Sequence, residues 1–355
     1  MNITKEIKGR NLNIDMLRVI CSIAIVVMHV IDFYVLSYNE VGEVFWTFIN
    51  ILESFIRFAL PIFFMISGAL LIKNFKESAM TFYKKRLVKI VVPYILSSIV
   101  YSIGNQILKT GGIALETVVR DIIEFEAHYH LWFFRPLIIM YILVPVIRKI
   151  ISYIETNNKI YIINWYLAIW TVLGIIIPTI VNIYNRTGII YGIESINYMG
   201  YFILGYAISN YYKDLLKNKE KLFVFTYVIA VIATIIANNF YLNRVIGVFN
   251  NYFIHPMTFN IYIQAVSIFT YFNLKTIRLS EKVMTVVQVV GVSSIYIYIL
   301  HPLLILIVRD VFNIDFFTGN LYFKSILVTL VVCILTVIAS IISAKVFNFF
   351  TKKLI

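Results

Sequence analysis

The chain has 355 residues, of which 61% are hydrophobic and 14% charged, whereas ordinary soluble domains have roughly 45–50% apolar and about 25% charged residues. This composition excludes a soluble globular fold, because so much apolar surface needs lipid around it. The formal net charge of +13 would suit either nucleic acid or an anionic membrane surface, so the positions of the basic residues must decide between them.

The apolar residues occur in ten runs of about 20 residues, the length that crosses the hydrocarbon core of a bilayer. We predict membrane spans at 17–37, 44–72, 88–108, 131–147, 160–181, 195–212, 222–241, 250–272, 285–309 and 323–346. The predicted fold is therefore an all-α polytopic membrane protein with about ten transmembrane helices. Residues 1–355 are expected to form a single membrane domain without an appended soluble domain.

The positions of the basic residues predict the orientation of the chain. With the N-terminus in the cytoplasm, 22 of the 31 Lys and Arg residues fall on the cytoplasmic side and 7 on the outer side, while Arg18 and Arg57 lie at membrane depth. By the positive-inside rule, both termini are then cytoplasmic. Topology accounts for the net charge, so we expect membrane lipids but no nucleic acid as partners.

The first span carries two ionisable residues, Arg18 and His29, and such residues inside a membrane are candidates for function. They are eleven residues apart, so they lie within about 20° of each other on one helix face and are separated by roughly 16 Å along the axis. An anionic substrate from the cytosol would meet Arg18 first and His29 at its reactive end. Asp32, three residues after His29, is a candidate to orient the imidazole. In the structural alternative, Arg18 contacts lipid phosphate and His29 bonds a backbone carbonyl.

The second span holds Glu53 and Arg57 four residues apart, which predicts one buried ion pair. Pro61 is expected to kink this helix, and Gly68 to permit close contact with another helix. In the cytoplasmic segment that follows, Arg86 and Lys89 share one face at the start of the third span. They are candidates for holding a phosphorylated ligand near Arg18, and the alternative is an anchor on anionic lipid.

The longest outer segment, about 109–130, is the expected acceptor-facing surface, with Glu126, His130 and Trp132 as candidate substrate-binding residues. The interfacial aromatic belt is an alternative explanation for Trp132. His128 and His130 do not form a metal site on their own, and the two cysteines lie in apolar runs at opposite ends of the chain, so we expect no metal. The His-Pro pairs at 255–256 and 301–302 are read as structural, because proline frees backbone groups that an imidazole can bond.

Four segments, in this order, resemble the membrane acyltransferase-3 family of bacterial and related O-acyltransferases, over essentially the whole chain. Arg18 followed by ten residues and His29 is similar to the family's basic-residue-x10-His signature. The segment RFALPIFFMISG at 57–68 resembles its phenylalanine-rich Ser-Gly segment, and YKKRLVKI at 83–90 resembles its Arg-x-x-Arg motif. The fourth feature is HLWF at 130–133 together with IYILHP at 297–302.

The resemblance implies transfer of an acyl group, commonly acetyl, from cytoplasmic acyl-CoA to a hydroxyl of an extracytoplasmic or lipid-linked glycan in a bacterial plasma membrane. Acetyl-CoA would be the donor, with Arg18 and Arg86 on its phosphates and His29 at the thioester as general base or transient acyl carrier. Lys89 departs from the family motif, since it replaces the second Arg, which would bind phosphate bidentately. Self-association as a homo-oligomer is left open.

Two other classes of function compete with this interpretation. A transporter or flippase for a small solute or lipid-linked sugar would be supported by inverted repeats with paired broken helices, and inspection of the sequence reveals none. A membrane receptor or scaffold has no positive sequence feature. The expected absence of a soluble esterase-like domain implies either direct acylation of the acceptor or transfer of the acyl group to a separate protein.

Overall fold

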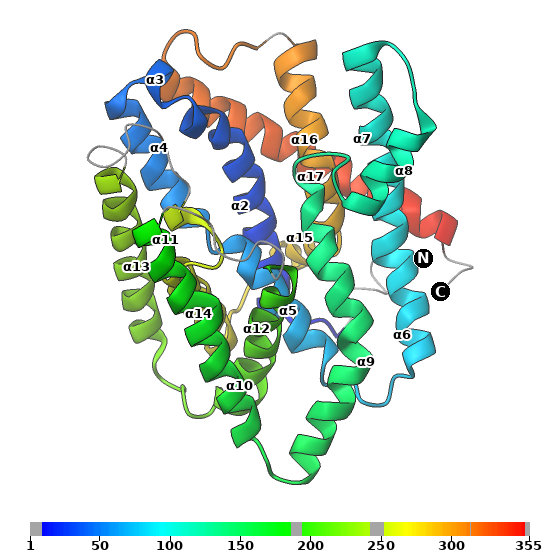
Figure 1. Cartoon of the computed structure of the whole chain (residues 1–355), viewed down its shortest axis with the longest axis vertical. Helices are drawn as coiled ribbons and strands as arrows, with labels where there is room; N and C mark the ends of the chain where they lie inside the picture. The colour runs from blue at the N-terminus through cyan, green and yellow to red at the C-terminus, as the bar shows by residue number, and fades with distance from the viewer. Residues whose placement is uncertain (1–8, 186–193, 242–251, 313, 352–355) are drawn as a thin grey trace.

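The computed structural model describes residues 9–185, 194–241, 252–312 and 314–351, which contain helices and no strand. The first half of the chain (Figure 1) contains α2 (Leu12–Leu36), α3 (Tyr38–Val41), α4 (Glu43–Ile56), α5 (Ala59–Leu71), α6 (Ala79–Arg86), η1 (Leu87–Val91), α7 (Val92–Thr110), α8 (Leu115–Glu124), η2 (Leu131–Phe133) and α9 (Phe134–Thr156). The second half contains α10 (Tyr161–Thr171), η3 (Val172–Ile176), α11 (Ile177–Asn185), α12 (Glu194–Ala207), η5 (Ile208–Tyr212), α13 (Glu220–Tyr241), η7 (Tyr252–Ile254), α14 (Phe259–Leu274), α15 (Glu281–Val292), α16 (Ser294–Leu306), η8 (Ile307–Val311) and α17 (Leu321–Thr351).

The prediction of an all-α polytopic membrane protein is confirmed. Within the described residues, eight helical segments are long and apolar enough to cross a membrane. The predicted spans 195–212 and 250–272 correspond to α12 with η5 and to the 16-residue α14. Residues 250 and 251 lie outside the described part of the chain, as do six basic residues used for orientation: Lys5, Lys8, Arg186, Arg244, Lys352 and Lys353.

Helix α2 lies at the centre of the bundle, where it packs against α4, α5, α14, α15, α16 and α17. It begins after Asn11, whose side chain accepts hydrogen bonds from the backbone N–H groups of Asn13 and Ile14. Its two halves contribute to the two main apolar cores of the described chain. This central position surrounds both Arg18 and His29 with side chains from other helices.

Several predicted spans contain a break or an irregular turn. The second divides into α4 and α5 at Arg57 and Phe58, because the ring of Pro61 clashes with the carbonyl four residues earlier. The third begins with the π-helical turn η1 just before Pro93. The predicted span 285–309 is interrupted at Ser293, and the segment long enough to cross runs from Ser294 to Val311.

Glycine lets α5 and α12 approach each other closely. A Cβ atom added to Gly68 of α5 would overlap the backbone carbonyl of Phe202 in α12, and one added to Gly205 of α12 would overlap the backbone of Met65 in α5. Small residues at such crossings are characteristic of helix packing in membranes. The close contact expected at Gly68 is thereby confirmed.

The outer segment predicted at 109–130 contains a short helix, α8, which had not been predicted from the sequence. Figure 1 shows the connection between α7 and α8 at the top of the view and the turn between α9 and α10 at the bottom. The 157–160 turn follows Lys149 and includes Lys159, so the bottom is the cytoplasmic side by the positive-inside rule. The loop that follows α8 turns back toward His29, whose ring lies 5.2 Å from that of Tyr129.

Candidate active site

A cavity of about 570 Å³ extends from the cytoplasmic ends of the helices to about the middle of the bundle. Its polar lining comes from the residues just before and within α2, from α5, from the α6–η1 junction, from α9 and from α16. Its apolar lining comes from α2, α5, η1, η2, α9, α15 and α16. We call it the cytoplasmic cavity; its lining residues include Arg10, Asp15, Arg18, Phe63, Ser67, Arg86, Lys89, Phe133, Phe134, Tyr141, Ser294 and Tyr298.

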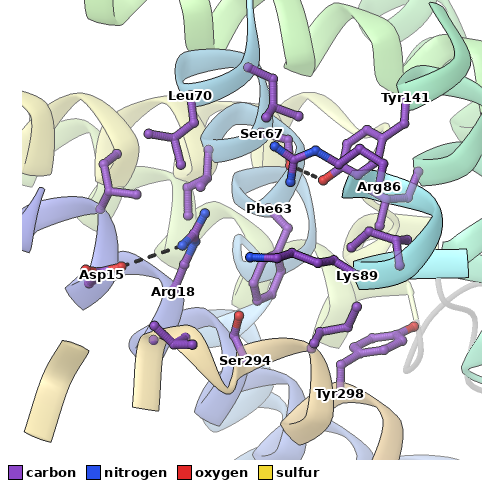
Figure 2. Close-up of a pocket in the computed structure, with 18 of the residues that line it drawn as sticks. Asp15, Arg18, Phe63, Ser67, Leu70, Arg86, Lys89, Tyr141, Ser294 and Tyr298 are labelled. Carbon is purple, nitrogen blue, oxygen red and sulfur yellow. Dashed lines mark hydrogen bonds and ion pairs between the residues drawn. The ribbon is translucent and has the colours of Figure 1, made fainter. Parts of the chain in front are cut away.

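Three basic residues predicted from the sequence line this cavity together. Figure 2 shows the charged groups of Arg18, from α2, and of Arg86 and Lys89, from the continuous α6–η1 segment, converging on the same space. The guanidinium of Arg86 lies 5.6 Å from the ring centre of Tyr141, a cation–π distance. Its Nε is buried without a hydrogen-bond partner within the described residues. A buried donor of this kind is costly unless a ligand satisfies it.

Asp15 neutralises part of this charge. Arg10 Nε donates a hydrogen bond to Asp15 Oδ2 at 2.8 Å, and Arg18 forms an ion pair with Asp15 Oδ1 at 3.6 Å. The carboxylate is buried, and it pairs with both arginines. Since Arg86 and Lys89 add further positive charge, the cavity suits an anionic ligand.

The inner end of the cytoplasmic cavity is aromatic. Phe63, Phe133 and Tyr298 line it, and the Phe133 and Tyr298 rings lie 5.0 Å apart. The Tyr298 hydroxyl donates to the backbone carbonyl of His130, and its ring centre is 5.8 Å from that of His301. Tyr298 therefore touches both the cytoplasmic cavity and the histidines beyond it.

Four of the five histidines gather in the outer half of the bundle, in a group that we call the histidine cluster: His29, His128, His130 and His301. The Nδ1 atom of His29 lies 2.9 Å from Nε2 of His301. The Nδ1 atoms of His128 and His130 are 3.0 Å apart, and the His130 and His301 rings are separated by 5.3 Å. Within the described residues, no group of three or more His, Cys, Asp or Glu side chains has a metal-site arrangement.

Asp32, expected to orient His29, instead pairs with a residue of the second span. Arg57 Nη2 lies 3.2 Å from Asp32 Oδ1, and Arg57 also forms an ion pair with Glu53. Glu53 is fully buried, so the ion pair predicted for the second span is confirmed and extended by a second carboxylate. The hydrogen-bond partner of His29 across the helix interface is His301 rather than Asp32.

The three candidate acceptor residues have different environments. Glu126 is exposed on the outer loop, Trp132 is 37% exposed with its ring 6.2 Å from that of Tyr198, and His130 is 1% exposed. The structure therefore brings His130 together with His29 through His301, while Glu126 and Trp132 lie nearer the outer surface. Their roles in binding an acceptor stay predictions.

Sequence reasoning missed the pairing of His29 with His301. The signal was available: α2 runs outward and the ninth predicted span does too, so residues 29 and 301 both fall in the outer half of their helices. Tyr298 was also missed, because a tyrosine within an apolar span has no distinctive pattern. Tyr298 matters because it contacts both the cytoplasmic cavity and the histidine cluster, and these contacts come from the packing of α16 against other helices.

These features define a multi-pass helical membrane protein with a cationic cavity on the cytoplasmic side and a titratable cluster beyond it. The chain belongs to the acyltransferase family, since the family model described as "Acyltransferase domain" matches residues 11–345. It is 24% identical over 301 residues to the "Probable poly-beta-1,6-N-acetyl-D-glucosamine export protein" of Staphylococcus aureus (strain Mu50), an alignment that covers 81% of this chain and 80% of that protein. No solved structure matches the chain. The family supports acyltransferase activity in a membrane setting.

Proposed function

We propose that the protein transfers an acyl group, acetyl in the first instance, from cytoplasmic acyl-CoA to a hydroxyl of an extracytoplasmic or lipid-linked glycan in a bacterial plasma membrane. The observation that carries this proposal is the joint placement of Arg18, Arg86 and Lys89 in one cytoplasmic cavity, with His29 beyond its inner end. CoA carries phosphates at one end and the thioester at the other, which matches a cationic entrance with an imidazole deeper in the membrane.

The proposed chemistry assigns different tasks to the two ends of the site. Arg18, Arg86 and Lys89 bind the phosphates by charge-assisted hydrogen bonds, and the aromatic inner wall excludes water from the thioester arm. His29 acts as a general base on the acceptor hydroxyl or as a transient acyl carrier. In either route the acyl–sulfur bond breaks, an acyl–oxygen bond forms, and the hydroxyl proton ends on the released thiol.

The name of the relative supports a glycan acceptor, since it refers to an N-acetylglucosamine polymer. Glu126, His130 and Trp132 are the residues proposed to meet that acceptor at the outer end. The same name contains the word export, which favours a second candidate function, movement of a glycan or lipid-linked sugar without acyl transfer. The two functions differ in their need for acyl-CoA.

The test uses purified protein in detergent or nanodiscs with radiolabelled acetyl-CoA, together with mass spectrometry of surface glycans from cells with and without the gene. We expect acetyl-CoA to bind, and we expect His29→Ala to lower acyl transfer by at least about 100-fold, the order lost with a general base, while acetyl-CoA still binds. Unchanged glycan acetylation in His29→Ala cells would contradict the mechanism. Glycan movement without acyl-CoA would favour the exporter.

A further inference from the structure

The hydrogen bonds around His301 determine which of its ring nitrogens carries a proton. His301 is fully buried, and its Nδ1 lies 3.2 Å from the backbone carbonyl of Ile297, one helical turn earlier. The carbonyl of Tyr298 is a second backbone hydrogen-bond partner of the same imidazole. Carbonyl oxygens only accept hydrogen bonds, so Nδ1 of His301 is the nitrogen that carries the proton.

Pro302 explains why a helix can offer a carbonyl to this ring. Proline has no backbone N–H, so the carbonyl four residues earlier, that of Tyr298, lacks its usual helical donor. The His301 side chain precedes the proline and supplies a donor in its place. The His-Pro pair at 301–302 thus fixes the orientation of the ring, with Nε2 directed at His29.

A neutral imidazole has one donor and one acceptor nitrogen. With Nδ1 of His301 donating to backbone, its Nε2 accepts, and the atom that donates to it at 2.9 Å is Nδ1 of His29. The Ile25 carbonyl, one turn before His29, is a further acceptor beside the same ring. The contact with His301 therefore favours a proton on Nδ1 of His29.

We propose that His301 is a positioning residue that holds His29 in the Nδ1–H tautomer, so that Nε2 of His29 is the bare nitrogen available for reaction. This inference rests on the proposed acyl transfer for its chemical consequence. In that reaction, Nε2 of His29 takes the proton of the acceptor hydroxyl, the hydroxyl oxygen bonds the acyl carbon, and the carbon–sulfur bond breaks. The proton then passes from Nε2 to the departing thiolate.

Neighbouring groups hold the backbone around the His29–His301 hydrogen bond in place. The Tyr101 hydroxyl donates to the carbonyl of Ile299 at 2.7 Å and accepts from the backbone N–H of Leu303 at 3.2 Å, which braces the backbone on both sides of His301. The charged and titratable groups around the pair are Arg57 with Asp32, Tyr129, His128, His130 and Tyr298.

The tautomer can be measured without any enzymatic activity. Protein labelled with ¹⁵N-histidine and placed in nanodiscs is examined by solid-state NMR, with the His29 signals identified by their loss in His29→Asn. We expect a protonated Nδ1 and a bare Nε2 on His29 in the unaltered protein and in His301→Gln, whose side-chain oxygen can still accept. In His301→Leu, a mixture of tautomers is expected. A bare Nδ1 in the unaltered protein would overturn the proposal.

Kinetics provides a second readout. We expect His301→Leu to lower kcat roughly 10- to 100-fold with little change in KM for acetyl-CoA, and His301→Gln to recover most of kcat. Acetyl-CoA binding by both variants checks that they fold. Equal kcat in His301→Leu and the unaltered protein, or equal loss in both variants, would refute the positioning role. Absence of acyl transfer in the unaltered protein would refute the proposed function alone, because the NMR result stands separately.

Discussion

At the scale of single residues, the cytoplasmic cavity concentrates more positive charge than its own carboxylate neutralises. Arg10, Arg18, Arg86 and Lys89 line it with Asp15, which already pairs with the first two. Holding like charges together is unfavourable, and the cost falls when an anion enters. The buried Nε of Arg86, which has no hydrogen-bond partner among the described residues, identifies one place where the anion would bind.

We therefore expect Arg86→Ala to weaken acetyl-CoA binding by about 1.5–3 kcal/mol, the range for a hydrogen bond to a charged group, or roughly 10- to 100-fold in Kd. Titration calorimetry on the purified protein measures it. Lys84→Ala is the matched control, because Lys84 is exposed, lies on the same helix and does not line the cavity. Equal weakening in both variants would show that general charge, rather than Arg86 itself, holds the ligand.

The placement of the basic residues followed from the sequence, whereas the partners of His29 did not. Arg18 and Arg86 were expected at one cytoplasmic entrance because both lie near the cytoplasmic ends of their spans, and the structure places both in the lining of the cytoplasmic cavity. Spacing on one helix allowed Asp32 to meet His29 but could not exclude a stronger partner. Arg57, on a different helix, forms an ion pair with Asp32, and His301 forms the hydrogen bond with His29.

At the scale of helices, the contact between α5 and α12 depends on glycine. We expect Gly68→Ala to destabilise the protein by about 1–3 kcal/mol, the usual cost of overpacking, because the backbone of Phe202 cannot rotate away from an added Cβ. Thermal unfolding in detergent measures the effect. Gly104→Ala in α7 is the control, since an added Cβ there meets nothing within 4 Å. An unchanged melting temperature for Gly68→Ala would mean that the two helices can separate freely.

A charged network ties the loop between α5 and α6 to α9. Glu77 accepts hydrogen bonds from Lys85 at 2.8 Å and Arg148 at 3.0 Å, and Arg148 Nε donates to the carbonyl of Leu71 at 2.8 Å. Burial alone would raise the pKa of the Glu77 carboxyl, but the bonds from Lys85 and Arg148 outweigh it, so the pKa lies below its ordinary value. This network holds the start of α6 against α9, and Arg86 is the last residue of that helix.

The lowered pKa gives the network a defined pH dependence. A carboxyl of this kind contributes stability above its ordinary pKa, about 4.3, and the contribution is lost as pH falls through the lowered folded value. We expect Glu77→Gln to lower the melting temperature at pH 7 and the difference from the unaltered protein to shrink below about pH 4. Glu116→Gln, on the exposed α8, should change little at either pH. A difference that grows on acidification would contradict this assignment.

Hydropathy predicted the membrane spans but not every helix boundary within or between them. Hydrophobic runs predicted the spans, but the interruption at Ser293 between α15 and α16 falls inside one predicted span. No proline or charge marks it, and the sequence signal there is Gly291 with the Ser293-Ser294 pair, which hydropathy averages out. The short helix α8 lies in the outer segment 109–130, for which we predicted an acceptor-facing surface but no secondary structure. Its apolar side packs back onto α7, which is a tertiary contact that hydropathy alone does not encode.

At the scale of the whole molecule, the two halves of the proposed site face opposite sides of the membrane. The cytoplasmic cavity lies on the side that carries most Lys and Arg. The histidine cluster lies in the outer half, where the end of the 109–130 segment supplies His128 and His130. Acyl-CoA is highly charged and does not cross a bilayer unaided. We therefore expect the acyl-CoA donor to enter only from the cytoplasmic side and the glycan acceptor to approach from the outer side.

Membrane vesicles of defined orientation test this asymmetry. In inside-out vesicles, acetyl-CoA added to the medium reaches the cytoplasmic cavity, so acetylation of lumenal or lipid-linked glycan is expected. In right-side-out vesicles the same addition should give no transfer until a detergent opens the bilayer, because Arg18, Arg86 and Lys89 then face the lumen. Arg86→Ala in inside-out vesicles should require more acetyl-CoA for the same rate. Equal transfer in intact vesicles of both orientations would mean that the donor enters from the outer side, which would contradict the assignment of the cationic cavity as the donor site.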